Sequence, residues 1–137
     1  MKNLFLLITI SLCLDAFSQE TTNKAESFPV YRSCSENLDY QGLKSCTTEK
    51  IMNFITLSFN YELADKLFPQ EESTQFLVEF IIDEKGKTKN ITAKAHKKEI
   101  AAEAIKLLKR LPKMKKPGYL NGKPVAVPFK ILMTIYF

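Results

Sequence analysis

The last third of the chain constrains the fold most, because it predicts a helix, a stop, a turn and a long closing strand in that order. Between Glu99 and Leu111 apolar residues recur at helical spacing, and Pro112 ends the helix. Asn121-Gly122 has the composition of a tight turn. From Val125 to Phe137 every second residue is apolar, which predicts a strand that buries one face.

Two further strands precede this helix. Residues 75–83 place Phe76, Val78, Phe80 and Ile82 on one face, and residues 87–95 carry alternating apolar positions. Asp83-Glu84-Lys85-Gly86 lies between them and predicts a tight hairpin turn, with Gly86 in the left-handed conformation. The two strands are therefore expected to pair antiparallel.

The connectivity predicts the order of the sheet. Because the helix returns the chain, the closing strand runs antiparallel to strand 75–83, and pairing beside that strand keeps the sheet wholly antiparallel. Numbered along the chain, the strands then lie in the order 2-1-3, with the closing strand at an edge. Pro128 agrees, since an edge strand tolerates a missing N–H. We expect an α+β fold whose helices pack on one face of this sheet.

An edge strand offers unpaired backbone groups to which an extended peptide can add as a further strand. We expect this peptide-binding edge along the backbone of Val125, Val127, Phe129, Ile131, Met133 and Ile135. On this interpretation, a proline at Ile131 would remove an edge N–H and abolish binding.

The N-terminus predicts export. Lys2, an apolar run from Leu4 to Leu14 and small residues at Ala16 and Ser18 are typical of a signal peptide over residues 1–18, cleaved after Ser18. The alternative is an uncleaved inner-membrane anchor, but an apolar run of 11 residues is short beside the roughly 20 that a spanning helix needs. We expect a protein of the periplasm or cell envelope, associated with a membrane only if the signal is retained.

The mature chain divides into three parts. Residues 19–33 are polar and predict a flexible lead-in. Residues 34–74 predict a helical part, with a helix that starts at Thr47 or Thr48 and breaks at Asn60, and residues 75–137 form the β-β-α-β unit. Cleavage removes Cys13 and leaves Cys34 and Cys46, an even count that predicts a disulfide in an exported protein.

The charges are divided unevenly along the chain. Residues 19–84 carry 5 basic and 12 acidic residues, whereas residues 85–130 carry 14 basic and 2 acidic ones. Nucleic acid is not expected as the partner, because the basic half has few aromatic residues and the protein is exported. An alternative function is binding of this basic face to anionic envelope surfaces. The cluster of Lys113, Lys115 and Lys116 is interpreted first as a solvated rim of the molecule. The alternative is a docking rim for a partner, with four candidate residues: Lys113, Lys115, Lys116 and Lys123.

No enzyme is expected from these residues. His96 is the only histidine, and no nucleophile, base and orienting group occur together around it. Two cysteines 12 positions apart without a nearby histidine are poor zinc ligands. We expect neither a catalytic residue, nor a cofactor, nor a metal site.

Three segments resemble the TonB C-terminal domain family. They are Val78–Asp83 with Gly86, Glu103–Met114, and Lys116–Val125 leading into the closing aromatic strand. The resemblance implies a protein-binding module of TonB-dependent transport. In this family the N-terminal box peptide of a TonB-dependent outer-membrane receptor adds as a strand to the free edge. A homodimer that pairs the edge strands of two copies is a further hypothesis.

The chain departs from the family pattern in three respects, one of which is an extra lysine at 115–116. TonB itself has a membrane anchor and a long proline-rich spacer, whereas this chain has a cleavable signal and a short lead-in, which argues against energy transduction unless the signal is retained. Where the family often has Tyr-Pro, this chain has Tyr61-Glu62, so a receptor contact usually placed there is not expected.

Overall fold

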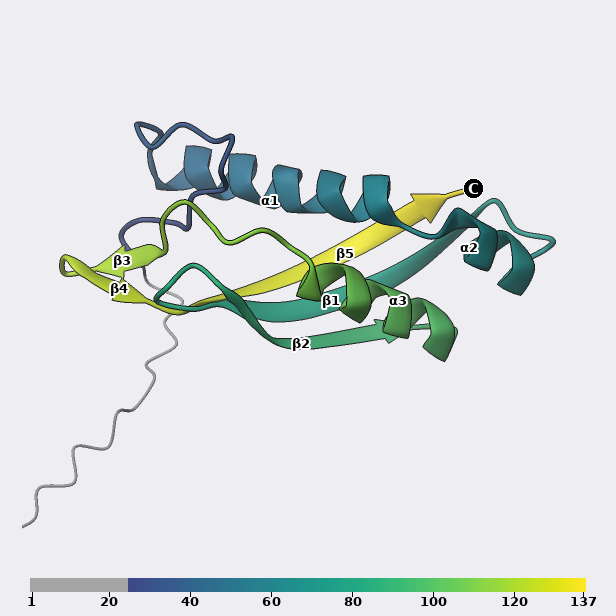
Figure 1. Ribbon diagram of the computed structural model, residues 1–137. Coiled ribbons are helices and arrows are strands. Elements are labelled where there is room, and N and C mark those ends of the chain that lie inside the picture. The colour runs from purple at the N-terminus through teal and green to yellow at the C-terminus, as the bar shows by residue number, and fades with distance from the viewer. Residues whose placement is uncertain (1–24) are drawn as a thin grey trace, which may run out of the picture.

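The computed structural model describes residues 25–137, so the predicted signal peptide lies outside the described residues. Within these described residues three helices and five strands follow one another, and Figure 1 shows their arrangement. Their bounds are α1 Tyr40–Ser58, α2 Tyr61–Leu67, β1 Ser73–Ile82, β2 Thr88–Ala95, α3 Lys98–Lys109, β3 Gly118–Leu120, β4 Lys123–Val125 and β5 Val127–Tyr136. In the part of the chain described, no helix has the length and apolarity to cross a membrane.

The main sheet has three antiparallel strands in the order β2-β1-β5, which confirms the predicted α+β class and strand order. β1 and β5 pair along their whole length, from Ser73 opposite Tyr136 to Ile82 opposite Val127. Most of the sheet is therefore formed by β1, in the middle, and β5, at one edge (Figure 1).

The helices α1 and α3 lie on the same side of the sheet (Figure 1) and bury one face of it in a single core. Alternate side chains of β1 and β5 point into this core, because successive residues of a strand face opposite ways. Those side chains are Phe76, Val78, Phe80, Ile82, Val127, Phe129, Ile131, Met133 and Ile135. The opposite face is open, with Leu132 and Tyr136 60% and 74% exposed.

The first helix begins seven residues earlier than predicted. Asp39 caps α1 by accepting a hydrogen bond from the N–H of Gly42 at 2.8 Å, so the helix starts at Tyr40 instead of at Thr47. The predicted break at Asn60 is confirmed, and the Asn60 side chain caps α2 by accepting from the N–H of Leu63 at 3.2 Å.

The segment before α1 also differs from the flexible lead-in expected over residues 19–33. From Ala25 onward it lies against the body of the protein, and Phe28 and Val30 are buried. Its backbone bridges to Tyr119 and Lys116. Tertiary contacts hold this polar-looking segment in place, and residues 19–24 lie outside the described part.

The closing strand is divided in two. β3 and β4 form a small hairpin whose turn, Asn121-Gly122, has positive φ angles of 52° and 72°, as its composition predicts. Val125 ends β4, opposite Gly118, and β5 starts only at Val127. Val125 therefore does not belong to the edge strand of the main sheet, contrary to the expectation from its alternation.

The hairpin between β1 and β2 forms as predicted, with Gly86 at φ 80°. Asp83 is buried there, 2% exposed, and accepts from the N–H groups of Lys85 and Lys87 at 2.9 and 2.8 Å. The ammonium of Lys89 lies 3.0 Å from its other oxygen. Burial raises the pKa of the Asp83 carboxyl, but these three donors lower it by more, so the pKa lies below its ordinary value.

Candidate functional site at the free edge of β5

β5 is paired along one side only. Within residues 25–137 its hydrogen-bonded neighbour is β1, and no other strand lies on its far side. The edge predicted from the connectivity is therefore present in the fold. An unpaired edge of this length presents a row of backbone donors and acceptors.

One hydrogen bond just beyond β5 shows which of its backbone groups face outward. The N–H of Phe137 donates to the carbonyl oxygen of Glu72 at 2.9 Å, next to the paired residues Ser73 and Tyr136. In an antiparallel ladder, residues that exchange hydrogen bonds with the partner strand alternate with residues that do not. Odd-numbered residues of β5 therefore bond to β1, and even-numbered ones point their backbone groups away from the sheet.

The outward-facing row of β5 consists of Pro128, Lys130, Leu132, Thr134 and Tyr136. Pro128 falls in this row, where its missing N–H breaks no bond to β1. The row thus offers four N–H donors and five carbonyl acceptors to an added strand. We refer to these five residues below as the outward row.

The residues predicted from sequence lie on β5, apart from Val125, which lies on β4, and they do not belong to the outward row. Val127, Phe129, Ile131, Met133 and Ile135 direct their backbone groups to β1 and their side chains into the core. A proline at Ile131 would therefore break the sheet instead of blocking the edge. The position of Pro128 in the sequence was the signal that could have shown the correct row.

A groove of about 390 Å³ runs along the first half of this edge, between β5 and α1. Its β5 wall extends from Val127 to Ile131, and its other lining residues are Phe28, Tyr40, Lys44 and Thr48. Phe28 packs against Phe129 and Tyr40, with ring centroids 5.0 and 5.6 Å away. The groove adjoins the outward row, and the sequence patterns gave no sign of it.

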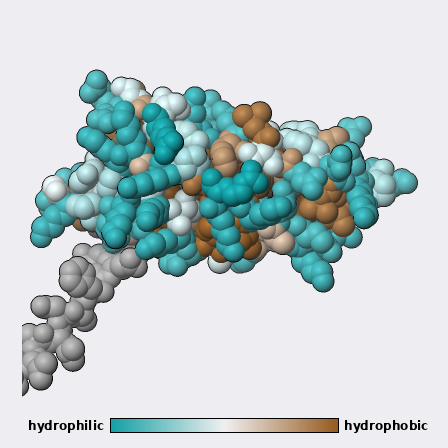
Figure 2. Space-filling view, viewed as in Figure 1, coloured by the Kyte–Doolittle hydropathy of each residue, from teal (hydrophilic) through white to brown (hydrophobic). Residues whose placement is uncertain are grey.

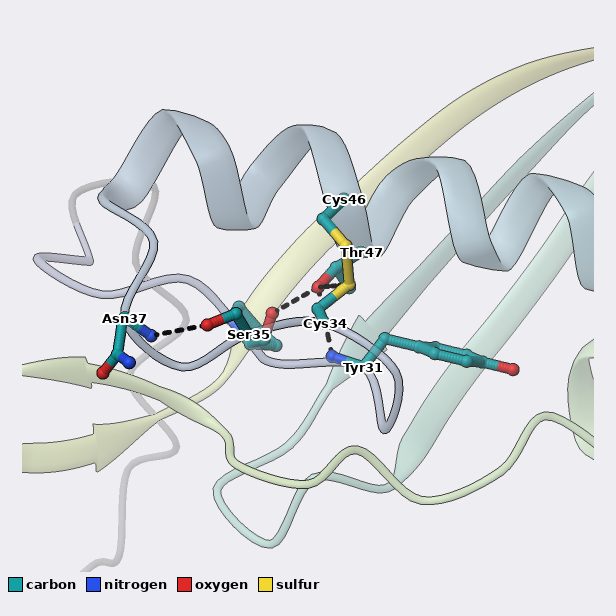
Figure 3. Close-up of a disulfide and its surroundings, with 7 residues drawn as sticks. Tyr31, Cys34, Ser35, Asn37, Cys46 and Thr47 are labelled. Carbon is teal, nitrogen blue, oxygen red and sulfur yellow. Dashed lines mark hydrogen bonds between the residues drawn. A yellow bond between two sulfur atoms is a disulfide. The ribbon is translucent and has the colours of Figure 1, made fainter.

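The segment that carries Phe28 is fixed to α1 by covalent and hydrogen bonds (Figure 3). Cys34 and Cys46 form the predicted disulfide. Next to it, the buried hydroxyl of Thr47 donates to the carbonyl oxygen of Pro29 at 2.8 Å and accepts from the N–H of Tyr31 at 3.1 Å. Thr47 or Thr48 was expected to cap the helix, but both lie inside α1, and Thr47 bonds to the segment that carries Phe28.

The predicted docking rim is exposed but is not part of the groove lining. Lys115 and Lys116 each lie 3.1 Å from a carboxylate oxygen of Glu36. Hydrogen bonds from Lys116 and Lys115 hold the pKa of Glu36 below its ordinary value. Two of the four lysines thus have a partner within the chain, which leaves Lys113 and Lys123 without an ion pair among the described residues.

The visible surface of the molecule is mostly hydrophilic, with apolar side chains in a few small patches (Figure 2).

In residues 25–137, no three or more His, Cys, Asp or Glu side chains are grouped so that they could hold a metal ion. Comparisons of the chain with protein-family models, with curated proteins and with solved structures find no match. We therefore interpret the site from its own geometry.

Proposed function

We propose that this protein is an exported binding module that takes an extended peptide as an added strand along the outward row of β5. The observation that carries the proposal is the alternation set by the bond from Phe137 to Glu72, which leaves four unpaired N–H groups in line. Main-chain hydrogen bonds supply the affinity in this mode of recognition, and side-chain pockets along the edge supply the specificity.

The partner we propose is the box peptide of a TonB-dependent outer-membrane receptor, bound in the periplasm. The resemblance of Val78–Asp83, Glu103–Met114 and Lys116–Val125 to TonB C-terminal domains supports this choice of partner. In this proposal the module docks on the receptor in the periplasm through this added strand.

The test uses the mature protein and fluorescein-labelled box peptides from receptors of the same organism. Leu132→Pro removes one N–H from the outward row without touching the bonds to β1, and Leu132→Ala is the matched control. We expect Leu132→Pro to weaken binding at least tenfold and Leu132→Ala to change it less than threefold. Circular dichroism and urea unfolding check that both variants fold.

Retained affinity in folded Leu132→Pro would contradict strand addition at β5. Binding to anionic lipid vesicles, weakened by salt and unchanged in Leu132→Pro, would instead favour the alternative in which the basic half of the chain contacts envelope surfaces. A mature protein that pairs edge strands between two copies would sediment as a dimer and would return to a monomer in Leu132→Pro.

A further inference from the structure

We infer that the groove between β5 and α1 selects the sequence of the added strand, with an apolar residue at one position and an acidic residue two positions along. This inference rests on the proposed function, because it concerns the side chains of a peptide bound at the β5 edge. It names the chemistry that the peptide must carry.

The pleat of the sheet determines which peptide residues enter the groove. Residues directly opposite each other in neighbouring strands point their side chains to the same face. Phe129 and Ile131 point toward the face that α1 covers, so peptide residues opposite them also point toward α1. The peptide residue between these two lies opposite Lys130 and points to the open face.

The first of these two positions favours an apolar side chain. Phe28 is 4% exposed and Phe129 is 6% exposed, and together with Tyr40 they form an aromatic corner at one end of the groove. An aliphatic or aromatic side chain opposite Phe129 would bury its surface against these rings. Burial of apolar area is the driving force available there.

The second position favours a carboxylate. Lys44 lies one helical turn beyond Tyr40 on α1, and four residues of helix advance about 6 Å. Two residues of an extended strand advance about 6.6 Å, so successive groove-facing side chains of the peptide match the spacing from Tyr40 to Lys44. α1 and β5 run in the same general direction (Figure 1). The distance between Tyr40 and Lys44 along the helix can therefore be compared directly with the distance between two residues of the added strand.

Charge complementarity supports an acidic residue opposite Ile131. The groove lining contains two lysines, Lys44 and Lys130, and no acidic residue. Lys130 lies 3.6 Å from Glu79, whereas Lys44 has no ion pair within residues 25–137. Lys44 is therefore the cation free to meet a carboxylate of the peptide.

The test uses three synthetic ten-residue peptides of one threonine-rich background, which differ at one position. In each peptide Val and the varied residue are separated by one threonine, and each peptide is made in both orders, so that addition parallel or antiparallel to β5 is covered. The varied residue is Glu in the first peptide, Gln in the second and Lys in the third. We expect the first to bind roughly fivefold more tightly than the second and the third to bind most weakly. In Lys44→Glu the order should reverse, so that the peptide with Lys binds best.

Lys98→Glu is the matched control, since it makes the same charge change at an exposed lysine outside the groove. It should leave the order of the three peptides unchanged. If all three bind equally to the unmodified protein and to Lys44→Glu, while Leu132→Pro still weakens them, the groove does not select and only this inference fails. If no peptide binds, or Leu132→Pro binds as well as the unmodified protein, the proposed function itself fails.

Discussion

The hydroxyl of Thr47 donates to the carbonyl oxygen of Pro29 at 2.8 Å and accepts from the N–H of Tyr31 at 3.1 Å. Through these two bonds a fully buried side chain of α1 fixes the segment that carries Phe28. The groove beside β5 therefore depends on residues that precede the β-β-α-β unit.

The Thr47 bonds predict a loss of stability when only the hydroxyl is removed. Thr47→Val keeps the side-chain shape but removes the partner of the part-buried N–H of Tyr31 and of the buried carbonyl oxygen of Pro29, which should cost about 2–3 kcal/mol. Urea unfolding measures the change. Thr56→Val, at an exposed position of the same helix, is the control and should be nearly neutral. Equal effects of the two substitutions would show that the Thr47 bonds contribute nothing.

The disulfide predicts a stability that depends on reductant. Cys34 and Cys46 are separated by 12 positions, and cross-linking a loop of this size stabilises the fold by about 3 kcal/mol on the chain-entropy account. Cys34→Ser with Cys46→Ser should lower the free energy of unfolding by about this amount. Adding a reductant should then affect the unmodified protein only. A mature protein whose two thiols react freely before reduction would contradict the pairing.

Asp83 predicts a dependence of stability on pH. Because its pKa is lowered in the folded protein, its contribution is present above the ordinary aspartate pKa of about 3.9 and is lost as the pH falls through the folded value. Asp83→Asn should cost about 1–2 kcal/mol at pH 7, since charged acceptors form stronger hydrogen bonds. The cost should shrink toward pH 2.5.

Urea unfolding across this pH range measures the effect, and Glu84→Gln is the control at the adjacent position. If the Asp83→Asn cost were the same at pH 7 and pH 2.5, the ionised carboxylate would not be the stabilising form.

Two glycines with positive φ predict different costs for the same substitution. At Gly122 an added Cβ meets no atom within 4 Å, so Gly122→Ala should cost only the backbone strain, about 1 kcal/mol. At Gly86 an added Cβ would lie 3.0 Å from the carbonyl oxygen of Met114. Gly86→Ala should therefore cost about 2–3 kcal/mol in thermal or urea unfolding. Equal losses would show that the Met114 segment moves away freely.

Much of the fold followed from the sequence because local signals were consistent with one another. The tight turn at Asp83–Gly86 and the helix that returns the chain leave one wholly antiparallel arrangement, and Pro128 agrees with it. The even count of cysteines expected after signal cleavage predicted the disulfide. These features depend on chain connectivity and turn chemistry, which are local properties.

The remaining features depend on contacts between distant residues, which periodicity does not report. Phe28 and Val30 are apolar residues isolated in a polar segment, and both are buried. Phe28 packs against Tyr40 and Phe129, and the backbone of Val30 bridges to Lys116. The end of β4 at Val125 could not be predicted, because apolar residues alternate without a break from Val125 to Phe137. To decide which residues of β5 face outward, the register of β5 against β1 and one hydrogen bond are needed. The even number of Pro128 already indicated the same row, because a proline is tolerated where no N–H bonds to the neighbouring strand.

The central claim is that the outward row of β5 accepts a strand, and amide hydrogen exchange measured by NMR tests it most directly. In the free protein, the N–H groups of Lys130, Leu132 and Thr134 should exchange quickly, whereas those of Phe129, Ile131 and Met133 should be protected by their bonds to β1.

A saturating box peptide should slow exchange at Lys130, Leu132 and Thr134 at least tenfold and leave Phe129, Ile131 and Met133 protected as before. Peptide binding that leaves the first three amides exchanging as fast as in the free protein would contradict the account.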